Sequence, residues 1–415
     1  MRRTVAFGYL AGVAAVALPT SVIAKPVAPN PRSQFGNFLP PTLSEDFEEK
    51  EVRAAIFPPT HPLHRLLTIL SLFAPTQALS AFSQMKMRTI SVGGDINAAV
   101  PTCYWESVGK VNSGFKVEGL AARLVAAFKA QPMLKEHRSL PGSLVASVRG
   151  WIGAVAGAGK PPRVLLLHGA DASTLEWRYL VPRLNALGVT TTAVDWWSGG
   201  WTERKSILDQ IDERDPSKPK PWTLVQQHLH AFWREQLKGE PVIVVGASLG
   251  GAVALDFAAS YPEAVAGLIL LDAGGESYKS PPPEVVSALS PVALGVKKAL
   301  AFITNRVPSE ELRINSLHRR EPEWAGALGA YLASGGYARR VGKDLIKTLE
   351  QPSLVIWGQD DPILPLEDAY AFEEDLKQCV GVREVPGCGH TPQLEDPDSV
   401  AVHVAQFAFE LGSRG

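Results

Sequence analysis

The sequence predicts an α/β fold in which a mostly parallel, eight-stranded sheet is covered by helices on both faces. From about residue 143 onward, short apolar segments alternate with longer amphipathic segments, as they do where crossover helices link parallel strands. Most of the apolar segments are rich in Val, Ile and Leu, which is typical of strands buried on both faces. Glycine-containing loops directly follow several of these strands, at the edge of the sheet where such folds place their functional sites.

The expected strands are short apolar runs, most of which end at Gly, His, Asp or Pro. They cover residues 144–148, 151–155, 163–167, 190–194, 241–245, 267–271, 353–357 and 382–385, the first two as an antiparallel opening pair. Helices are expected where apolar residues recur every three to four positions and so share one face. These segments are 173–187, 223–237, 252–259 and 366–376, preceded by an amphipathic helix at 116–130.

The alternation of strands and helices stops between residues 274 and 350, in a long interval with helical apolar patterning. The core is therefore expected to consist of residues 143–273 and 351–412, with 274–350 inserted between two of its strands. Residues 85–142 are expected to be an N-terminal extension of the core.

Composition excludes several classes of partner and cofactor. The 415 residues are 46% apolar and 20% charged, which allows one domain of about 250–280 residues with extensions. A net charge of -1 gives no basic surface for nucleic acid, so none is expected as a partner. The three cysteines are too few for a disulfide scaffold, and His and Cys lack metal-ligand spacing. No metal or other cofactor is expected.

Residues 1–84 are expected to be a targeting presequence with a proline-rich linker. Arg2 and Arg3 precede a mostly apolar stretch at 5–18, and small residues follow where a signal peptidase would cut. A second apolar run at 66–74 precedes a cleavage-like site, so the segment resembles the bipartite plastid presequences of algae with secondary plastids. Secretion is the alternative destination, and the second run also fits an ordinary core or surface segment. The apolar stretches are too interrupted for a membrane span, and none is expected in the mature protein.

The segment Gly246-Ala247-Ser248-Leu249-Gly250 carries the strongest functional signal. It joins a buried strand to a helix, and a serine between glycines at such a turn is typical of a nucleophile elbow. The turn forces unfavourable backbone angles and brings strand and helix close together, which glycine tolerates because it lacks a Cβ. We therefore expect Ser248 to be a nucleophile, although so short a pattern also arises by chance and needs partners elsewhere.

The loop after the strand at 163–167 is expected to complete the site of Ser248. It reads His168-Gly169-Ala170, and small residues leaving a strand can direct a backbone N–H at a nearby oxyanion. The expected oxyanion-hole donors are the N–H groups of Ala170 and Leu249. His168 itself is expected to be structural.

Two later loops offer a carboxylate and a histidine. Asp360 and Asp361 follow one predicted strand at the carboxyl edge of the sheet, although an Asp-Asp pair also fits a solvated turn. Gly389 and His390 follow the last predicted strand. Apart from His168, His390 is the only histidine expected on a loop at this edge.

The order Ser248, Asp361, His390 is the order nucleophile, acid, base of the α/β-hydrolases, and with the His168-Gly169 loop the chain resembles that superfamily over residues 143–412. More narrowly, three segments are similar to plastid-type, pheophytinase-like hydrolases of plants and algae. They are Leu175-Glu176-Trp177-Arg178-Tyr179, Asp195-Trp196-Trp197 and Ser334-Gly335-Gly336-Tyr337.

The resemblance implies a role for several further residues. The acid is the fourth residue of a Gly-x-x-Asp motif, which falls on Asp361, and Asp272 is the alternative because some members place the acid one strand earlier. The resemblance also implies that 274–350 forms a helical cap over the pocket. Aromatic residues of the cap and of the segment after the strand at 190–194 are then candidate pocket walls, although each fits ordinary packing as well: Trp196, Trp197, Trp201, Trp324, Tyr331 and Tyr337.

The sequence thus predicts a serine hydrolase that cleaves an ester, thioester or related acyl bond of an apolar small molecule. A serine at the elbow argues against dehalogenase and epoxide-hydrolase chemistry, which requires a carboxylate there. Two alternatives stay open: a C–C bond hydrolase or cofactor-free haloperoxidase-like enzyme, and a ligand receptor that keeps the hydrolase fold with little turnover.

Overall fold

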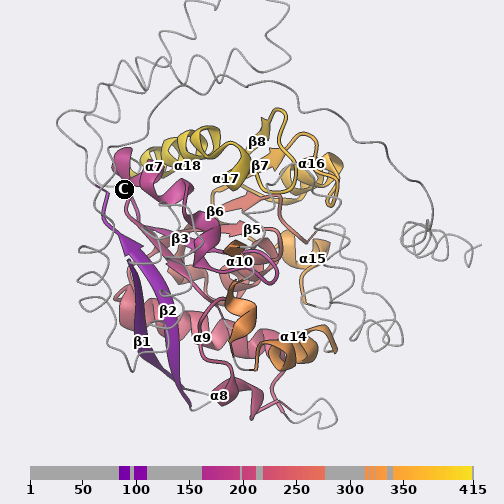
Figure 1. Cartoon of the computed structure of the whole chain (residues 1–415). Helices are drawn as coiled ribbons and strands as arrows, with labels where there is room; N and C mark the ends of the chain where they lie inside the picture. The colour runs from indigo at the N-terminus through magenta and orange to yellow at the C-terminus, as the bar shows by residue number, and fades with distance from the viewer. Residues whose placement is uncertain are drawn as a thin grey trace, which may run out of the picture.

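The computed structural model describes residues 84–93, 98–109, 161–196, 199–211, 218–275, 314–315, 317–321, 323–333 and 340–413. They form one eight-stranded sheet with the order β1-β2-β4-β3-β5-β6-β7-β8 (Figure 1). The β1–β2 and β2–β4 pairs are antiparallel and all other pairs are parallel, so the predicted mostly parallel sheet is confirmed. The strands are β1 (Met85–Val92), β2 (Ala98–Ser107), β3 (Val164–Leu167), β4 (Thr191–Val194), β5 (Val242–Ala247), β6 (Val265–Leu271), β7 (Ser353–Gly358) and β8 (Cys379–Val385).

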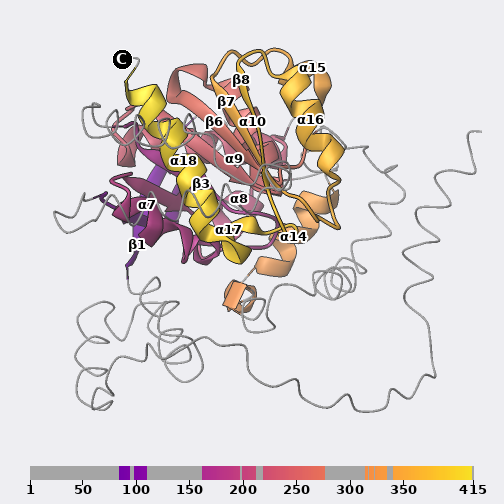
Figure 2. The ribbon, with the colours of Figure 1, turned by 90° about the horizontal axis from the view of Figure 1, so that it is seen from above.

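Helices cover both faces of the sheet, because successive side chains of each central strand point to opposite sides. In β3, Leu165 and Leu167 pack in one apolar cluster with α9 and α10, whereas Val164 and Leu166 pack in a second cluster with α7 and α18. Figure 2 shows α7 and α18 on the same side. The helices are η2 (Thr174–Trp177), α7 (Leu180–Ala186), α8 (Lys205–Leu208), α9 (Pro221–Gln236), α10 (Leu249–Ser260), η3 (Pro262–Ala264), η4 (Leu317–Arg320), α14 (Trp324–Ala333), α15 (Lys343–Ile346), α16 (Leu366–Asp375), α17 (Pro392–Glu395) and α18 (Pro397–Gly412).

The N-terminal boundary of the core is a correction to the sequence-based expectation. Residues 85–107 supply the antiparallel edge of the sheet, whereas they were expected to lie in an extension outside it. β1 is an edge strand with exposed Lys86 and Arg88, so it lacks the continuous apolar run that identifies a central strand. The predicted opening pair at 144–148 and 151–155 and the helix at 116–130 lie outside the described residues.

The predicted helix at 173–187 is divided into η2 and α7. Ser173 caps η2 by accepting a hydrogen bond from the Leu175 N–H, at 3.3 Å. Pro182 lies in the first turn of α7, where its missing N–H removes no intrahelical bond. A continuous helix would place this proline in the interior and lose such a bond, so the chain ends one helix and begins another.

The described part of the 274–350 insertion is helical and packs on the core. Ala327 and Tyr331 of α14 are buried in the same cluster as α9 and α10, and Ile346 of α15 joins that cluster. Whether the whole insertion acts as a cap stays a prediction. Among the described residues, no helix combines the length and apolar character that a membrane crossing requires.

Burial of His228 makes the stability of the fold sensitive to acid. His228 is a buried residue of α9, and its Nε2 contacts the Thr102 hydroxyl of β2 at 2.7 Å. That hydroxyl donates to the Val100 carbonyl, so it accepts from a neutral His228, and the described residues offer Nδ1 no partner. Burial lowers the pKa of His228 to about 4, well below its ordinary value.

We expect His228→Gln to lessen the loss of stability in acid. The folded-state pKa lies below the unfolded value, so the unfolded chain binds more protons between about pH 4 and 6.5, and stability falls as the pH falls through this window. From pH 7 to pH 5 the difference in unfolding free energy between wild type and His228→Gln should shift by about 2 kcal/mol. Urea denaturation of both proteins at both pH values measures this shift. The contributions of the other titratable groups to the pH dependence are the same in both proteins and cancel in the difference. A difference that does not vary with pH would contradict the assignment.

Candidate active site

Ser248 lies at a sharp turn between the end of β5 and the first residue of α10. Its backbone is strained, with φ 50° and ψ -119°, in a region that residues with a Cβ rarely adopt. Three backbone hydrogen bonds hold it there: its N–H donates to the Leu271 carbonyl at 3.0 Å, and its own carbonyl accepts from Gly251 and Gly274 at 2.9 and 2.8 Å. The expected elbow geometry is therefore present.

The glycines around the turn allow β5, α10 and β3 to approach closely. A Cβ at Gly246 would lie 2.2 Å from the Gly250 carbonyl oxygen, and a Cβ at Gly250 would lie 2.2 Å from the Leu167 carbonyl oxygen. Because both neighbours are backbone atoms, any side chain at either position would displace the elbow.

The structure brings Ser248, His390 and Asp361 into one hydrogen-bonded row. His390 Nδ1 lies 2.7 Å from Asp361 Oδ2, and His390 Nε2 lies 2.9 Å from Ser248 Oγ. An ionised carboxylate only accepts, so Nδ1 carries the proton and Nε2 accepts from the Ser248 hydroxyl. The three side chains come from the loops after β5, β7 and β8, which meet at the carboxyl edge of the sheet.

The structure distinguishes the three candidate carboxylates by their contacts. Asp361 also accepts the Ile363 and Leu364 N–H groups on Oδ1, at 2.7 and 3.1 Å, which fixes its orientation toward His390. Asp360 is exposed, and its N–H donates to a carbonyl of the loop after β8. Asp272 is buried behind the row and accepts the Gly358 N–H at 2.9 Å.

The burial of Asp272 disfavours the charged form of its carboxyl. Its burial, followed by the negative charge of Asp361, raises its pKa well above the ordinary value. Asp272, Asp361 and His390 also form the one group of possible metal ligands found among the described residues, with donor atoms within 4.8 Å of one another. A cation bound by His390 would have to displace the bond of one ring nitrogen, either to Asp361 or to Ser248, so it would interrupt the row.

Two glutamates that the sequence analysis did not single out hold the loops of this site. Glu395 accepts the N–H groups of Gly389 and Thr391, at 2.8 and 3.1 Å, on either side of His390. Glu176 of η2 is buried and accepts the Gly169 N–H at 2.8 Å on one oxygen and the Gln393 amide at 2.5 Å on the other.

Glu176 thereby connects the loop after β3 to the loop that carries His390. Burial raises the pKa of the Glu176 carboxyl, which the Gly169 N–H and the Gln393 amide partly offset by stabilising its charge. One feature of the sequence could have identified Glu176: it is a charged residue within the mostly apolar segment Thr174–Trp177. Charged residues are rarely buried unless they have partners.

The expected oxyanion donors lie on the two loops that flank Ser248. Leu249 is the first residue of α10, so its N–H is one of the four that have no partner within a helix. Ala170 follows Gly169, at which a Cβ would lie 3.3 Å from the Ser248 Cβ. Their role stays a prediction.

The candidate pocket residues that the structure describes are buried. Trp196 stacks on His168 with ring centroids 5.1 Å apart, and its indole N–H donates to the His168 carbonyl at 3.0 Å. His168 is itself fully buried. Trp201, Trp324 and Tyr331 are also buried, while Trp197 and Tyr337 lie outside the described residues. Their role as pocket walls stays a prediction.

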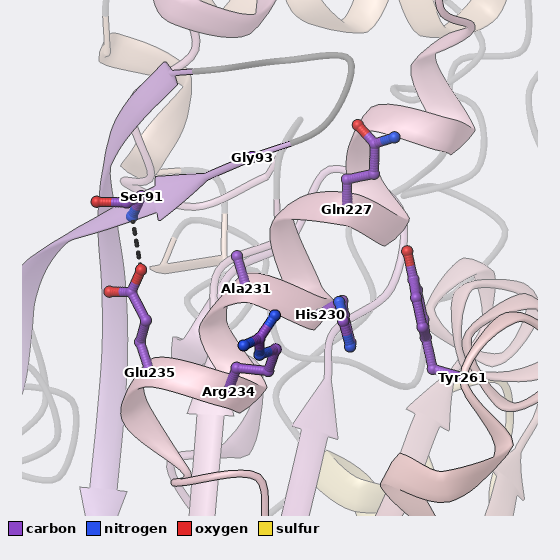
Figure 3. Close-up of a pocket in the computed structure, with 8 residues that line it drawn as sticks. All are labelled: Ser91, Gly93, Gln227, His230, Ala231, Arg234, Glu235 and Tyr261. Carbon is purple, nitrogen blue, oxygen red and sulfur yellow. Dashed lines mark hydrogen bonds between the residues drawn. The ribbon is translucent and has the colours of Figure 1, made fainter.

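A separate cavity of about 620 Å³ lies at the opposite end of α10 (Figure 3). Tyr261 follows the last turn of this helix, so the cavity is about 18 Å from Ser248 along a 12-residue helix. Its lining is Ser91, Gly93, Gln227, His230, Ala231, Arg234, Glu235 and Tyr261. Glu235 accepts the Ser91 N–H there at 3.0 Å, as the dashed line marks. The cavity is therefore separate from the row of Ser248, His390 and Asp361.

The chain is similar to several known proteins. A family model described as "Alpha/beta hydrolase family" matches residues 164–403. The chain is 32% identical over 259 residues to the alpha/beta hydrolase domain-containing protein VTE7 of Arabidopsis thaliana, which covers 59% of this chain and 73% of that protein. It is 28% identical over 265 residues to 2-hydroxy-6-oxo-6-(2'-aminophenyl)hexa-2,4-dienoic acid hydrolase of Metapseudomonas resinovorans, covering 60% and 85%. A thermophilic esterase from Thermogutta terrifontis shares the fold, with a TM-score of 0.53 at 18% identity over 79% of this chain and 99% of that one.

Proposed function

This chain belongs to the alpha/beta hydrolase family, and from that premise we propose that it is a serine hydrolase cleaving an ester, thioester or related acyl bond of an apolar small molecule. The expected superfamily, fold class and hydrolytic kind of enzyme are confirmed by the family match and by the hydrolases that the chain resembles. The resemblance to plant hydrolases agrees with the similarity to VTE7.

The observation that carries the proposal is the position of His390, whose two ring nitrogens contact Asp361 and Ser248 at 2.7 and 2.9 Å. His390 takes the Ser248 proton as Oγ attacks the acyl carbonyl, and Asp361 stabilises the imidazolium that forms. His390 then gives this proton to the leaving group. The acyl group now resides on Ser248, and His390 removes a proton from a water that hydrolyses it.

The N–H groups of Ala170 and Leu249 are proposed to stabilise the oxyanion that forms in each of these steps. Donors fixed before the reaction cost no reorganisation as charge develops, and each is worth about 3–4 kcal/mol in serine hydrolases. Two observations support this role. Glu176 holds the Gly169 N–H next to Ala170, and Leu249 is the first residue of helix α10.

Turnover of a short-chain p-nitrophenyl ester tests the proposal against the receptor alternative. An enzyme releases many equivalents of p-nitrophenol per mole of protein, whereas a receptor with little turnover releases one equivalent in a burst. A burst without a steady state would leave the receptor as the better description of this chain.

A second candidate function is hydrolysis of a carbon–carbon bond next to a ketone, which the same three side chains can support. It is supported by the similarity to the M. resinovorans protein, whose named substrate contains a ketone and a carboxylic acid but no ester. Cleavage of that dienoic acid without turnover of esters and thioesters would favour this candidate.

We also propose that the protein acts in a plastid. The support is the bipartite pattern of residues 1–84, which lie outside the described residues except for Gln84, together with a relative from a plant. A fusion of residues 1–100 to a fluorescent protein is expected to accumulate in plastids of an alga with secondary plastids. A cytosolic signal, or secretion into the medium, would contradict the assignment.

A further inference from the structure

Asp171, the residue after Ala170, carries an unusual set of contacts. Its side chain is fully buried, and three donors on it come from the insertion between β6 and β7. His318 Nε2 and Trp324 Nε1 lie 2.9 and 2.7 Å from Oδ1, and Arg319 lies 2.9 Å from Oδ2. A residue of the proposed oxyanion loop (168–171) is thus bound to a segment about 150 residues further along the chain.

The backbone at Asp171 depends on these contacts. Its φ of 49° lies in the left-handed region, which is unfavourable for residues with a Cβ and least so for Asp and Asn. On the other side of Ala170, the Gly169 N–H is held by Glu176 at 2.8 Å. The residues on either side of Ala170 are therefore held by Glu176 of the core at Gly169 and by the insertion at Asp171.

The segment that holds Asp171 is itself packed on the core. Arg178, which is buried, donates to the Asn315 side chain at 2.9 Å, and Ile314 and Leu317 are buried in the cluster that contains β3 and β5. The His318 ring meets the Trp201 ring edge-on, with centroids 6.3 Å apart. The insertion therefore reaches the loop through a defined contact.

We propose that Asp171 is a positioning residue, through which His318, Arg319 and Trp324 of the insertion fix the oxyanion loop and align the Ala170 N–H for catalysis. This inference rests on the proposed function. Asp171 does not contact the reacting atoms in this account. It acts through the backbone of its neighbour, and the insertion thereby helps to position the catalytic machinery.

A positioning role predicts a particular kinetic pattern. Negative charge on the oxygen develops in the transition state and is full in the tetrahedral intermediate, so misalignment of one donor weakens those states more than it weakens substrate binding. The loss should appear in kcat and in kcat/KM by the same factor, with KM nearly unchanged.

The test is the variant Asp171→Asn, assayed with a short-chain p-nitrophenyl ester and by the rate of labelling with a fluorophosphonate. Asparagine keeps the size and the tolerance of positive φ, and its oxygen can still accept from His318 and Trp324, but it loses the charge paired with Arg319. We expect kcat and the labelling rate to fall about 10- to 100-fold, with KM within about twofold of wild type.

The matched control is Asp256→Asn. Asp256 is also a buried carboxylate paired with an arginine, Arg340 at 2.7 Å, but it lies two turns along α10 from Ser248. It should lose a comparable amount of thermal stability while kcat stays within about twofold. If kcat falls by the same factor in both variants, the effect is general destabilisation and the positioning role is overturned.

Two substitutions of His318 decide the question even if Asp171→Asn does not fold. His318→Gln keeps an N–H that can reach Asp171, and His318→Leu removes it, so only the leucine variant should lose kcat. Equal kcat in both variants overturns the proposal.

If turnover in the wild type does not require Ser248, the proposed function fails and this inference fails with it. If turnover requires Ser248 but Asp171→Asn is fully active, the positioning role alone fails.

Discussion

Ser248→Ala is expected to abolish ester turnover and covalent labelling by a fluorophosphonate. Removing the hydroxyl leaves His390 with no proton to accept and the acyl carbonyl with no nucleophile at the end of the row. Loss of the nucleophile in a serine hydrolase costs roughly 10⁴- to 10⁶-fold in kcat. Alanine keeps the Cβ, so the strained elbow is retained and the fold should persist. Mass spectrometry of the labelled protein and steady-state kinetics measure the two losses.

Ser260→Ala is the matched control for this change. Ser260 is the last residue of the same helix, α10, and its hydroxyl contacts Asp256 at 3.4 Å, far from His390. This variant should label and turn over like the wild type. If labelling persists in Ser248→Ala, or is lost in Ser260→Ala instead, Ser248 is not the nucleophile and the proposed mechanism is overturned.

Asp361→Asn is expected to lower kcat by about 10⁴-fold through the tautomer of His390. The Ile363 and Leu364 N–H groups both donate to Oδ1, so the asparagine oxygen should remain with them and its NH₂ group should face His390. Nδ1 would then have to accept a hydrogen bond from this NH₂ group, so the ring proton would lie on Nε2, the nitrogen that faces Ser248. In that tautomer His390 cannot accept the serine proton. The measurement is kcat/KM against pH, with circular dichroism to confirm folding.

Two neighbouring aspartates provide the controls for Asp361. Asp360→Asn changes an exposed residue and should keep kcat within about twofold. Asp272→Asn replaces a carboxyl whose pKa burial raises and that lies outside the row of Ser248, His390 and Asp361, so it should also retain most activity. If Asp272→Asn rather than Asp361→Asn removes activity, the acid is the residue after β6, and the assignment of Asp361 is wrong.

The elements that could be predicted from the sequence share a local signal. The central strands β3, β5, β6 and β7 are mostly apolar runs, and β5 leads into glycines that a tight strand-to-helix turn requires. The antiparallel strands β1 and β2 were missed because polar and apolar residues mix along them, and the edge strand β1 also has an exposed face. The choice between Asp360 and Asp361 could be made only from the resemblance to a family, since both follow the same strand.

The amino-acid sequence by itself determined where the parallel strands of the core and their turns lie, and with them the order of Ser248, Asp361 and His390 along the chain. Periodicity and turn chemistry act between near neighbours, so they can be read from a short segment. The tertiary structure showed that Asp361 faces the imidazole, as the resemblance had implied and as the residues alone could not decide. It also decided that Glu176 meets Gln393, and that Asp171 meets His318 across 147 positions of sequence. Such contacts depend on how distant segments pack against one another, and no local pattern specifies them.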